Sequence, residues 1–162
     1  FNAEKINTHC GSLRVYISKS NKKKIHSNVK KLLNEEIKFG LKNFETYRNF
    51  GKKVYEIRKN VLRNLKKLKQ KEKKIIGFGA PAKATTALNF YGITDQIDFI
   101  VEDNPLKHNK FIPGVKIPIK NKSHIKDNDN TLIVLAWNFF NDIKENNSEL
   151  SKNIINIKNL ET

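Results

Sequence analysis

Three short segments of this sequence combine residues that could bind or transform a ligand. Each follows an apolar run typical of a buried strand, and together they offer glycine, carboxylate, amide, lysine and tryptophan groups. Buried strands of this kind form parallel sheets, whose ligands bind outside the carboxyl ends of the strands. We therefore expect the three segments to converge on one site. They are GFGAPAK (residues 77–83), VEDNP (101–105) and AWN (136–138).

The segment GFGAPAK has the residues of a turn that holds an anion. Gly77 and Gly79 let the backbone bend sharply and come close to a ligand. After Ala80, Pro81 suits the first position of a helix, where free N–H groups and partial positive charge attract an anion. Lys83 opposes the helix dipole, which makes sense if an anionic group lies nearby. We predict a phosphate or diphosphate here; a tight turn with an exposed lysine is the alternative.

The segments VEDNP and AWN would complete such a site. Glu102 or Asp103 ends a strand a little over twenty residues after the glycine turn, where an acidic side chain often binds ribose hydroxyls. The alternative is that one of them caps the turn made by DNP; Asn104 adds to the polar rim of this loop. Trp137 either stacks on a base or sugar or closes the edge of the core. Asn138 is a candidate N-cap for the next helix.

No set of residues in the sequence points to catalysis. His9 and Cys10 are neighbours on a predicted strand, so their side chains point to opposite faces and make a poor nucleophile–base pair. We find no metal-ligand spacing and no nucleophile elbow. These residues predict a ligand-binding half that lacks its reactive half.

The elements before residue 73 predict a connector between two domains. The alternating run at residues 11–20 predicts a strand without a partner nearby in sequence, so we expect its partners upstream of Phe1. From Ser27, a candidate N-cap, apolar spacing predicts a helix to about Leu41. A longer apolar stripe over residues 44–68 predicts a second helix that packs on a neighbouring domain.

The rest of the chain alternates strands and helices. This pattern predicts an α/β fold: a Rossmann-like, mostly parallel sheet flanked by helices. We expect three regions: residues 1–24 as the tail of an upstream domain, 25–72 as a helical connector and 73–162 as the Rossmann-like domain. Within the last, the expected order is strand KIIGFG, helix PAKATTALNFYG, strand QIDFIVED, a short strand at 115–117, strand TLIVLAW, helix NFFNDIKENNSELSK and strand NIINI.

Composition narrows the classes of function. The net charge of +16 suggests nucleic acid, but most of the excess lysine lies on solvated helix faces and is not interleaved with aromatic residues, so we do not expect that partner. No apolar run is long enough to span a membrane. The single Cys10 fits a reducing cytoplasm. A start at Phe1 suggests a piece of a longer chain.

Four ordered motifs carry a resemblance to a known family. GFGAPAKATTALNFYGI, VEDNPLKHNKFIPGVKIPI and LIVLAWNFFNDI resemble the C-terminal domain of the sugar C-methyltransferases, which use S-adenosylmethionine and act on nucleotide-activated deoxysugars. The opening THCGSLRVYI is similar to the last strands of the family's methyltransferase domain, with Cys10 in place of a glycine. Ala84 also replaces a frequent glycine. The resemblance covers nearly the whole chain.

The resemblance implies a division of labour. The family's S-adenosylmethionine site and its Glu–His catalytic motif would lie upstream of Phe1. The family's zinc-binding N-terminal segment would lie further upstream still. This chain would then bind the nucleotide diphosphate sugar against the upstream methyltransferase domain, without catalysing methylation alone, with the GAPAK turn near the diphosphate.

Two other classes remain open. An NAD(P)-binding module of an oxidoreductase would use the same glycine turn, although the third glycine of the dinucleotide fingerprint is missing. A basic nucleic-acid-binding protein would show an affinity that falls steeply with salt.

Overall fold

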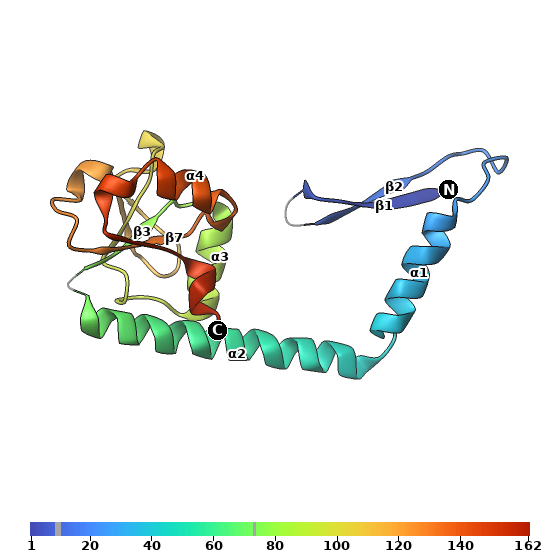
Figure 1. Ribbon diagram of the computed structural model, residues 1–162, viewed down its shortest axis with the longest axis horizontal. Helices are drawn as coiled ribbons and strands as arrows, with labels where there is room; N and C mark the ends of the chain where they lie inside the picture. Colours follow the sequence, from blue (N-terminus) through green and yellow to red (C-terminus); the bar gives the residue numbers. More distant parts are fainter. Residues whose placement is uncertain (9–10, 73) are drawn as a thin grey trace. The chain divides into compact units, whose positions relative to one another are not determined.

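The computed structural model describes residues 1–8, 11–72 and 74–162, so His9 and Cys10, considered above, lie outside the described residues. The chain forms two compact units, residues 1–54 and 55–162. In Figure 1, whose colours run from blue at residue 1 to red at residue 162, the first unit is blue to turquoise and the second runs from blue-green to red. None of the helices in the described part of the chain is both long enough and apolar enough to span a lipid bilayer.

The first unit contains a β-hairpin and a helix. Strands β1 (Asn2–Ile6) and β2 (Ser12–Tyr16) pair antiparallel, with Lys5 opposite Leu13. The prediction that the second strand has no nearby partner was therefore wrong. The segment NAEKI gives little strand signal because only one of its residues is β-branched, and cross-strand pairing holds it instead, including an ion pair between Arg14 and Glu4 at 3.2 Å.

Helix α1 (Ser27–Phe39) follows the hairpin. Its N-cap is His26, which makes no side-chain capping bond, so the prediction that Ser27 caps the helix was wrong by one residue. Gly40 ends the helix in the left-handed conformation, with φ of 83°, as a C-terminal glycine commonly does.

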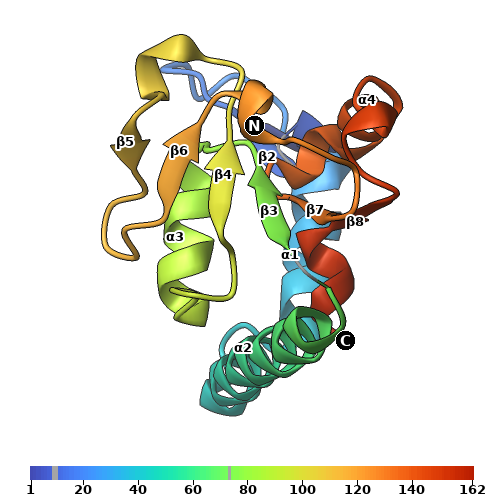
Figure 2. The same ribbon diagram turned by 90° about the vertical axis from the view of Figure 1, so that its left-hand side faces the viewer.

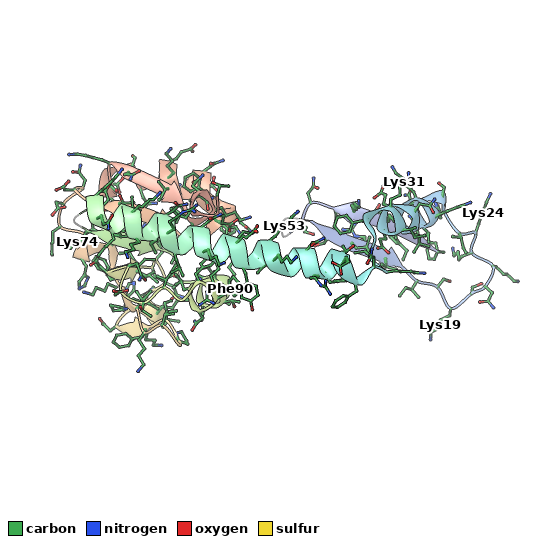
Figure 3. All side chains as sticks on the ribbon, turned by 90° about the horizontal axis from the view of Figure 1, so that it is seen from below. Lys19, Lys24, Lys31, Lys53, Lys74 and Phe90 are labelled. Carbon is green, nitrogen blue, oxygen red and sulfur yellow. The ribbon has the colours of Figure 1, made fainter. Side chains whose placement is uncertain are left out.

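Helix α2 (Phe44–Lys71) belongs to both units and confirms the predicted long helix. Its apolar stripe divides into two parts. In the second unit Val61 and Leu65 are fully buried, whereas Phe44 and Phe50 in the first unit are 70% and 67% exposed. Figure 3 shows the side chains around this helix, with Phe90 beside it; the Arg58 guanidinium lies 5.9 Å from the Phe90 ring centroid.

The second unit is built on a six-stranded sheet, which confirms the predicted fold class. The strand order is β5–β6–β4–β3–β7–β8, and all neighbours are parallel except β5 and β6 (Figure 2). The strands are β3 (Ile75–Phe78), β4 (Phe99–Val101), β5 (Lys110–Phe111), β6 (Pro118–Lys120), β7 (Thr131–Val134) and β8 (Asn153–Asn156).

The loop before β6 differs from the expectation. The short strand predicted at residues 115–117 lies at Pro118–Lys120, and β5 was not predicted. Gly114 and Lys116 both have positive φ, 84° and 58°, so the backbone between them turns rather than extends. The two strands therefore form a small hairpin at the edge of the sheet.

Helices cover both faces of the sheet. On one face α2 and α3 (Ala82–Tyr91) pack with the 3₁₀ helix η6 (Ile157–Leu160). On the other lie α4 (Phe140–Glu145) and η5 (Ser148–Leu150). The remaining 3₁₀ helices are η2 (Pro105–Lys107), η3 (Lys122–His124) and η4 (Trp137–Phe139).

The helix after β7 is much shorter than predicted. Residues expected to form one helix divide into η4, α4 and η5. The run Asn146–Asn147–Ser148 has low helix propensity, and the Asn147 amide donates to Ile143 O at 2.7 Å and so ends the helix locally. The prediction that Asn138 is an N-cap was wrong, because the N-cap of α4 is Phe139 and that of η4 is Ala136.

Replacing Gly77 with alanine should destabilise the second unit by about 1–3 kcal/mol, because a methyl group there overpacks the core. An added Cβ would lie 2.7 Å from Ile100 Cγ1 and 3.0 Å from Leu135 Cδ1. Urea unfolding followed by the fluorescence of Trp137 measures the change. Gly51→Ala is the control, since open space surrounds Gly51. Equal stability of Gly77→Ala and wild type would show that this close approach is not required.

Candidate functional site

The sheet changes direction at β3. The chain leaves β3 through α3 to reach β4 on one side, and later returns to β7 on the other side. In open α/β sheets a ligand binds beyond the carboxyl ends of the strands at such a switch point. Here that position lies between the loop after β3 and the loop after β7.

The loop after β3 lies close to its neighbours. Gly79 has φ of 86°, and its N–H donates to Val101 O at 2.8 Å. An added Cβ on Gly79 would lie 3.1 Å from Ala136 Cβ, so the loops after β3 and β7 touch. This position requires glycine for its conformation and for that close approach. Gly77, in contrast, serves the packing of β3.

The backbone of this loop offers few groups to a ligand. The Ala80 N–H donates to Glu102 Oε2 at 2.8 Å, and Pro81 has no N–H to donate. Pro81 is the N-cap of α3 rather than its first helical residue, which corrects the prediction by one position. The first intrahelical bond runs from Ala84 N–H to Pro81 O, so the N–H groups of Ala82 and Lys83 precede it.

Two lysines share one aromatic ring at the switch point. Lys83 Nζ lies 4.4 Å from the centroid of the Trp137 ring system, and Lys158 Nζ lies 5.8 Å from it. Among the described residues, neither ammonium group forms an ion pair with a carboxylate. Lys158 lies in η6, directly after β8. Lys158 was not predicted as a site residue. It follows the last parallel strand, and a position directly after a buried strand is the criterion by which the other three loops were chosen.

The carboxylate of Glu102 is bound from three sides. Besides Ala80, it accepts hydrogen bonds from the Asn104 N–H at 3.1 Å and from Lys107 Nζ at 3.2 Å. Burial acts to raise the pKa of Glu102, but these donors outweigh it, and the pKa lies below its ordinary value. Glu102 therefore caps the turn, as in the second of the two interpretations of VEDNP.

The other two polar residues of this loop also have local partners. Asp103 forms an ion pair with Lys122 at 2.7 Å, and its side chain is 66% exposed. The Asn104 side chain accepts a hydrogen bond from Leu106 N–H at 3.0 Å and caps η2. Asn138 lies exposed in η4. The structure thus brings Lys83 and Trp137 together, while Glu102 and Asn104 serve the loop itself.

Two of the groups that hold a nucleoside cofactor in the Rossmann manner are occupied in this domain. Such a cofactor needs free N–H groups at the first turn and a free carboxylate after the second strand. Here the Ala80 N–H and both oxygens of Glu102 are occupied by partners within the chain. The same mismatch applies to NAD(P) and to S-adenosylmethionine.

Comparison with known proteins gives the family. The sequence profile of the C-methyltransferase C-terminal domain matches residues 7–156. The chain belongs to the family of C-methyltransferase C-terminal domains. It is also similar to C-methyltransferase NovU of Streptomyces niveus, with 29% identity over 130 residues. That match covers 77% of this chain and 30% of the relative, so the chain spans about a third of the relative's length. The resemblance seen in the sequence is confirmed.

Glu102→Gln should reduce stability at neutral pH and make it less sensitive to acid. The folded-state pKa of Glu102 is lowered from its ordinary value of 4.5. The charged carboxylate therefore stabilises the fold above pH 4.5, and this stabilisation is lost as the pH falls through the folded-state pKa. The gap between wild type and variant should therefore shrink on acidification. Urea unfolding from neutral pH to about pH 3 tests this. The control is Glu149→Gln, at an exposed position; a gap that widens in acid would contradict the assignment.

Proposed function

We propose that this chain is the substrate-binding C-terminal domain of an S-adenosylmethionine-dependent C-methyltransferase that acts on a nucleotide-activated deoxysugar. The chain itself holds the substrate and does not catalyse the transfer. The observation that carries the proposal is the placement of Lys83 and Lys158 on Trp137 at the switch point of the sheet. Membership in the family supports the C-methyltransferase part.

The two lysines suit a diphosphate. The two ammonium groups lie 4.4 Å and 5.8 Å from the centroid of the Trp137 ring system, and we propose that one diphosphate contacts both. An exposed cation–π contact contributes about 0.5–1 kcal/mol, whereas a hydrogen bond to a charged group contributes about 1.5–3 kcal/mol. Moving each ammonium from the ring to a phosphate is therefore favourable, and it leaves the ring face for a base or sugar.

The proposal assigns the methyl donor to another domain. S-adenosylmethionine supplies the methyl group, and the first turn of this domain is not built to hold it. The part played by this chain is to bind the diphosphate through Lys83 and Lys158 and to orient the sugar attached to it. Trp137 excludes water from one side of that site.

We also propose that the first unit packs on a methyltransferase domain of the same protein. No described residue of 1–54 is buried, and α1 buries none of its side chains. A unit without a core does not hold together through hydrophobic burial of its own. Its exposed apolar side chains, which a neighbouring domain would cover, are Leu13, Val15, Ile17, Ile25, Leu33, Ile37, Phe39, Leu41, Phe44, Tyr47 and Phe50.

The coding sequence upstream of Phe1 tests both proposals. A strand–loop for S-adenosylmethionine followed by a Glu–His pair is the expected finding. An upstream sequence without them, or with a dinucleotide-dependent oxidoreductase domain, would contradict the proposed function.

Lys83→Ala and Lys158→Ala should each weaken binding of deoxythymidine diphosphate by about tenfold or more, because each removes a charged hydrogen bond of about 1.5–3 kcal/mol. Isothermal titration calorimetry measures the affinity. Lys126→Ala is the charge-matched control at an exposed position outside the site. Wild-type affinity in both site variants, or an equal loss in the control, would contradict the assignment.

Hydrogen exchange should separate the two units. Amides of β3, β4 and β7 should be the most protected, because these strands are fully buried. Amides of β1, β2 and α1 should exchange faster by orders of magnitude, because they cover no core. Exchange followed by mass spectrometry on the 162-residue chain gives the comparison. Equal protection of both units would contradict the view that the first unit has no core of its own.

A further inference from the structure

A side chain of the protein occupies the turn where a dinucleotide's diphosphate would bind. Glu102 Oε2 accepts the Ala80 N–H at 2.8 Å, directly before α3. In Rossmann folds this turn, after the first strand of the nucleotide-binding unit, donates its N–H groups to the diphosphate. The position of the anion is taken here by a carboxylate from the next strand.

The Glu102 carboxylate is held in place by several hydrogen bonds. The Glu102 side chain is 14% exposed, and its second oxygen accepts the Asn104 N–H. Lys107 Nζ bridges Glu102 Oε2 and Ala80 O, at 3.2 Å and 3.0 Å. The carboxylate, the lysine and the loop backbone thus satisfy one another, and the carboxylate could leave only if all three donors lost their partner.

A diphosphate at this turn would meet two obstacles. The Ala80 N–H is already bonded and the next residue, Pro81, has none to offer, so only the N–H groups of Ala82 and Lys83 remain at this turn. In addition, the Glu102 carboxylate, held there by Lys107, already fills the position in front of the Ala80 N–H that a phosphate oxygen would take.

We propose that Glu102 is a specificity-determining residue that excludes dinucleotides from the first turn of this domain. The ligand's negative charge is thereby left to Lys83 and Lys158, the two lysines that lie on the Trp137 ring. This inference rests on the proposed function only for the ligand that is admitted; the exclusion itself follows from the bonds of Glu102.

The test measures binding of NAD⁺ and inorganic pyrophosphate to wild type, Glu102→Ala and Glu102→Gln by isothermal titration calorimetry. Glu102→Ala empties the turn and leaves Lys107 without its carboxylate, so both affinities should rise by at least about tenfold. Glu102→Gln removes only the charge and retains an oxygen that can accept the Ala80 N–H, so a smaller rise is expected. If Glu102→Ala does not fold, the affinities of Glu102→Gln alone test the proposal.

Asp103→Asn is the matched control. It removes the same charge from the adjacent, exposed residue, and both affinities should stay within about twofold of wild type. The NMR signal of the Ala80 backbone amide in ¹⁵N-labelled protein shows whether pyrophosphate binds at this turn. This signal should move with pyrophosphate in the Glu102 variants and stay in place in wild type.

Three results would overturn the inference. They are NAD⁺ binding by wild type that moves the Ala80 amide signal, unchanged affinities in folded Glu102 variants, and an equal gain in Asp103→Asn. None depends on deoxythymidine diphosphate. Loss of the proposed function would appear instead as wild-type binding of that nucleotide by Lys83→Ala, so the two proposals fail separately.

Discussion

Burial of the central strand β3 on both faces is the constraint on which the second unit depends. Ile75 packs in the core beneath α2 and α3, while Ile76 and Phe78 pack in the core beneath α4. β3 is parallel to both of its neighbours, β4 and β7, and the helical links that parallel pairing requires bring the loops to one edge. Gly77 sharpens the constraint, because Ile100 and Leu135 fill the space where its side chain would be.

At that edge, polar groups pair with one another before any ligand arrives. Gly79 N–H is bonded to Val101 O, Ala80 N–H to Glu102, and Asp103 to Lys122. Partly buried polar groups without partners are costly, so the loops that follow three neighbouring strands are tied together. Lys83 and Lys158 differ, since an aromatic ring is a weak partner that a phosphate can replace. The distinction between groups that build the loops and groups free to bind comes from these pairings.

The sequence predicted the elements of the second unit better than their ends. Apolar strands and the glycine turn were sufficient to place β3, α3, β4, β7 and β8, because burial leaves a clear pattern. The strand at β2 was predicted, but β1, its pairing with β2, and the short β5 were not, because the residues of β1 and β5 carry no such pattern. The helix after β7 was overextended, since low propensity at Asn146 and Asn147 outweighed the apolar spacing.

The site was predicted in outline and changed in detail. Lys83 and Trp137 were selected because they follow buried strands, and they do meet. The partner of Glu102 could not be predicted, because ribose binding and turn capping require the same residue at the same place. Only the 2.8 Å bond to Ala80 separates the two. Lys158 follows the last parallel strand, but the sequence does not show that it meets Trp137, and that contact is what makes it part of the site.

Helix α2 joins a unit that has a core to one that has none. We therefore do not expect this chain to melt as a single two-state event, because the buried side chains that make unfolding cooperative lie in residues 55–162. A calorimetric transition would report that part alone and remain silent about the hairpin. Thermal stability measured on this chain is thus a property of one half of it, whatever happens to the other.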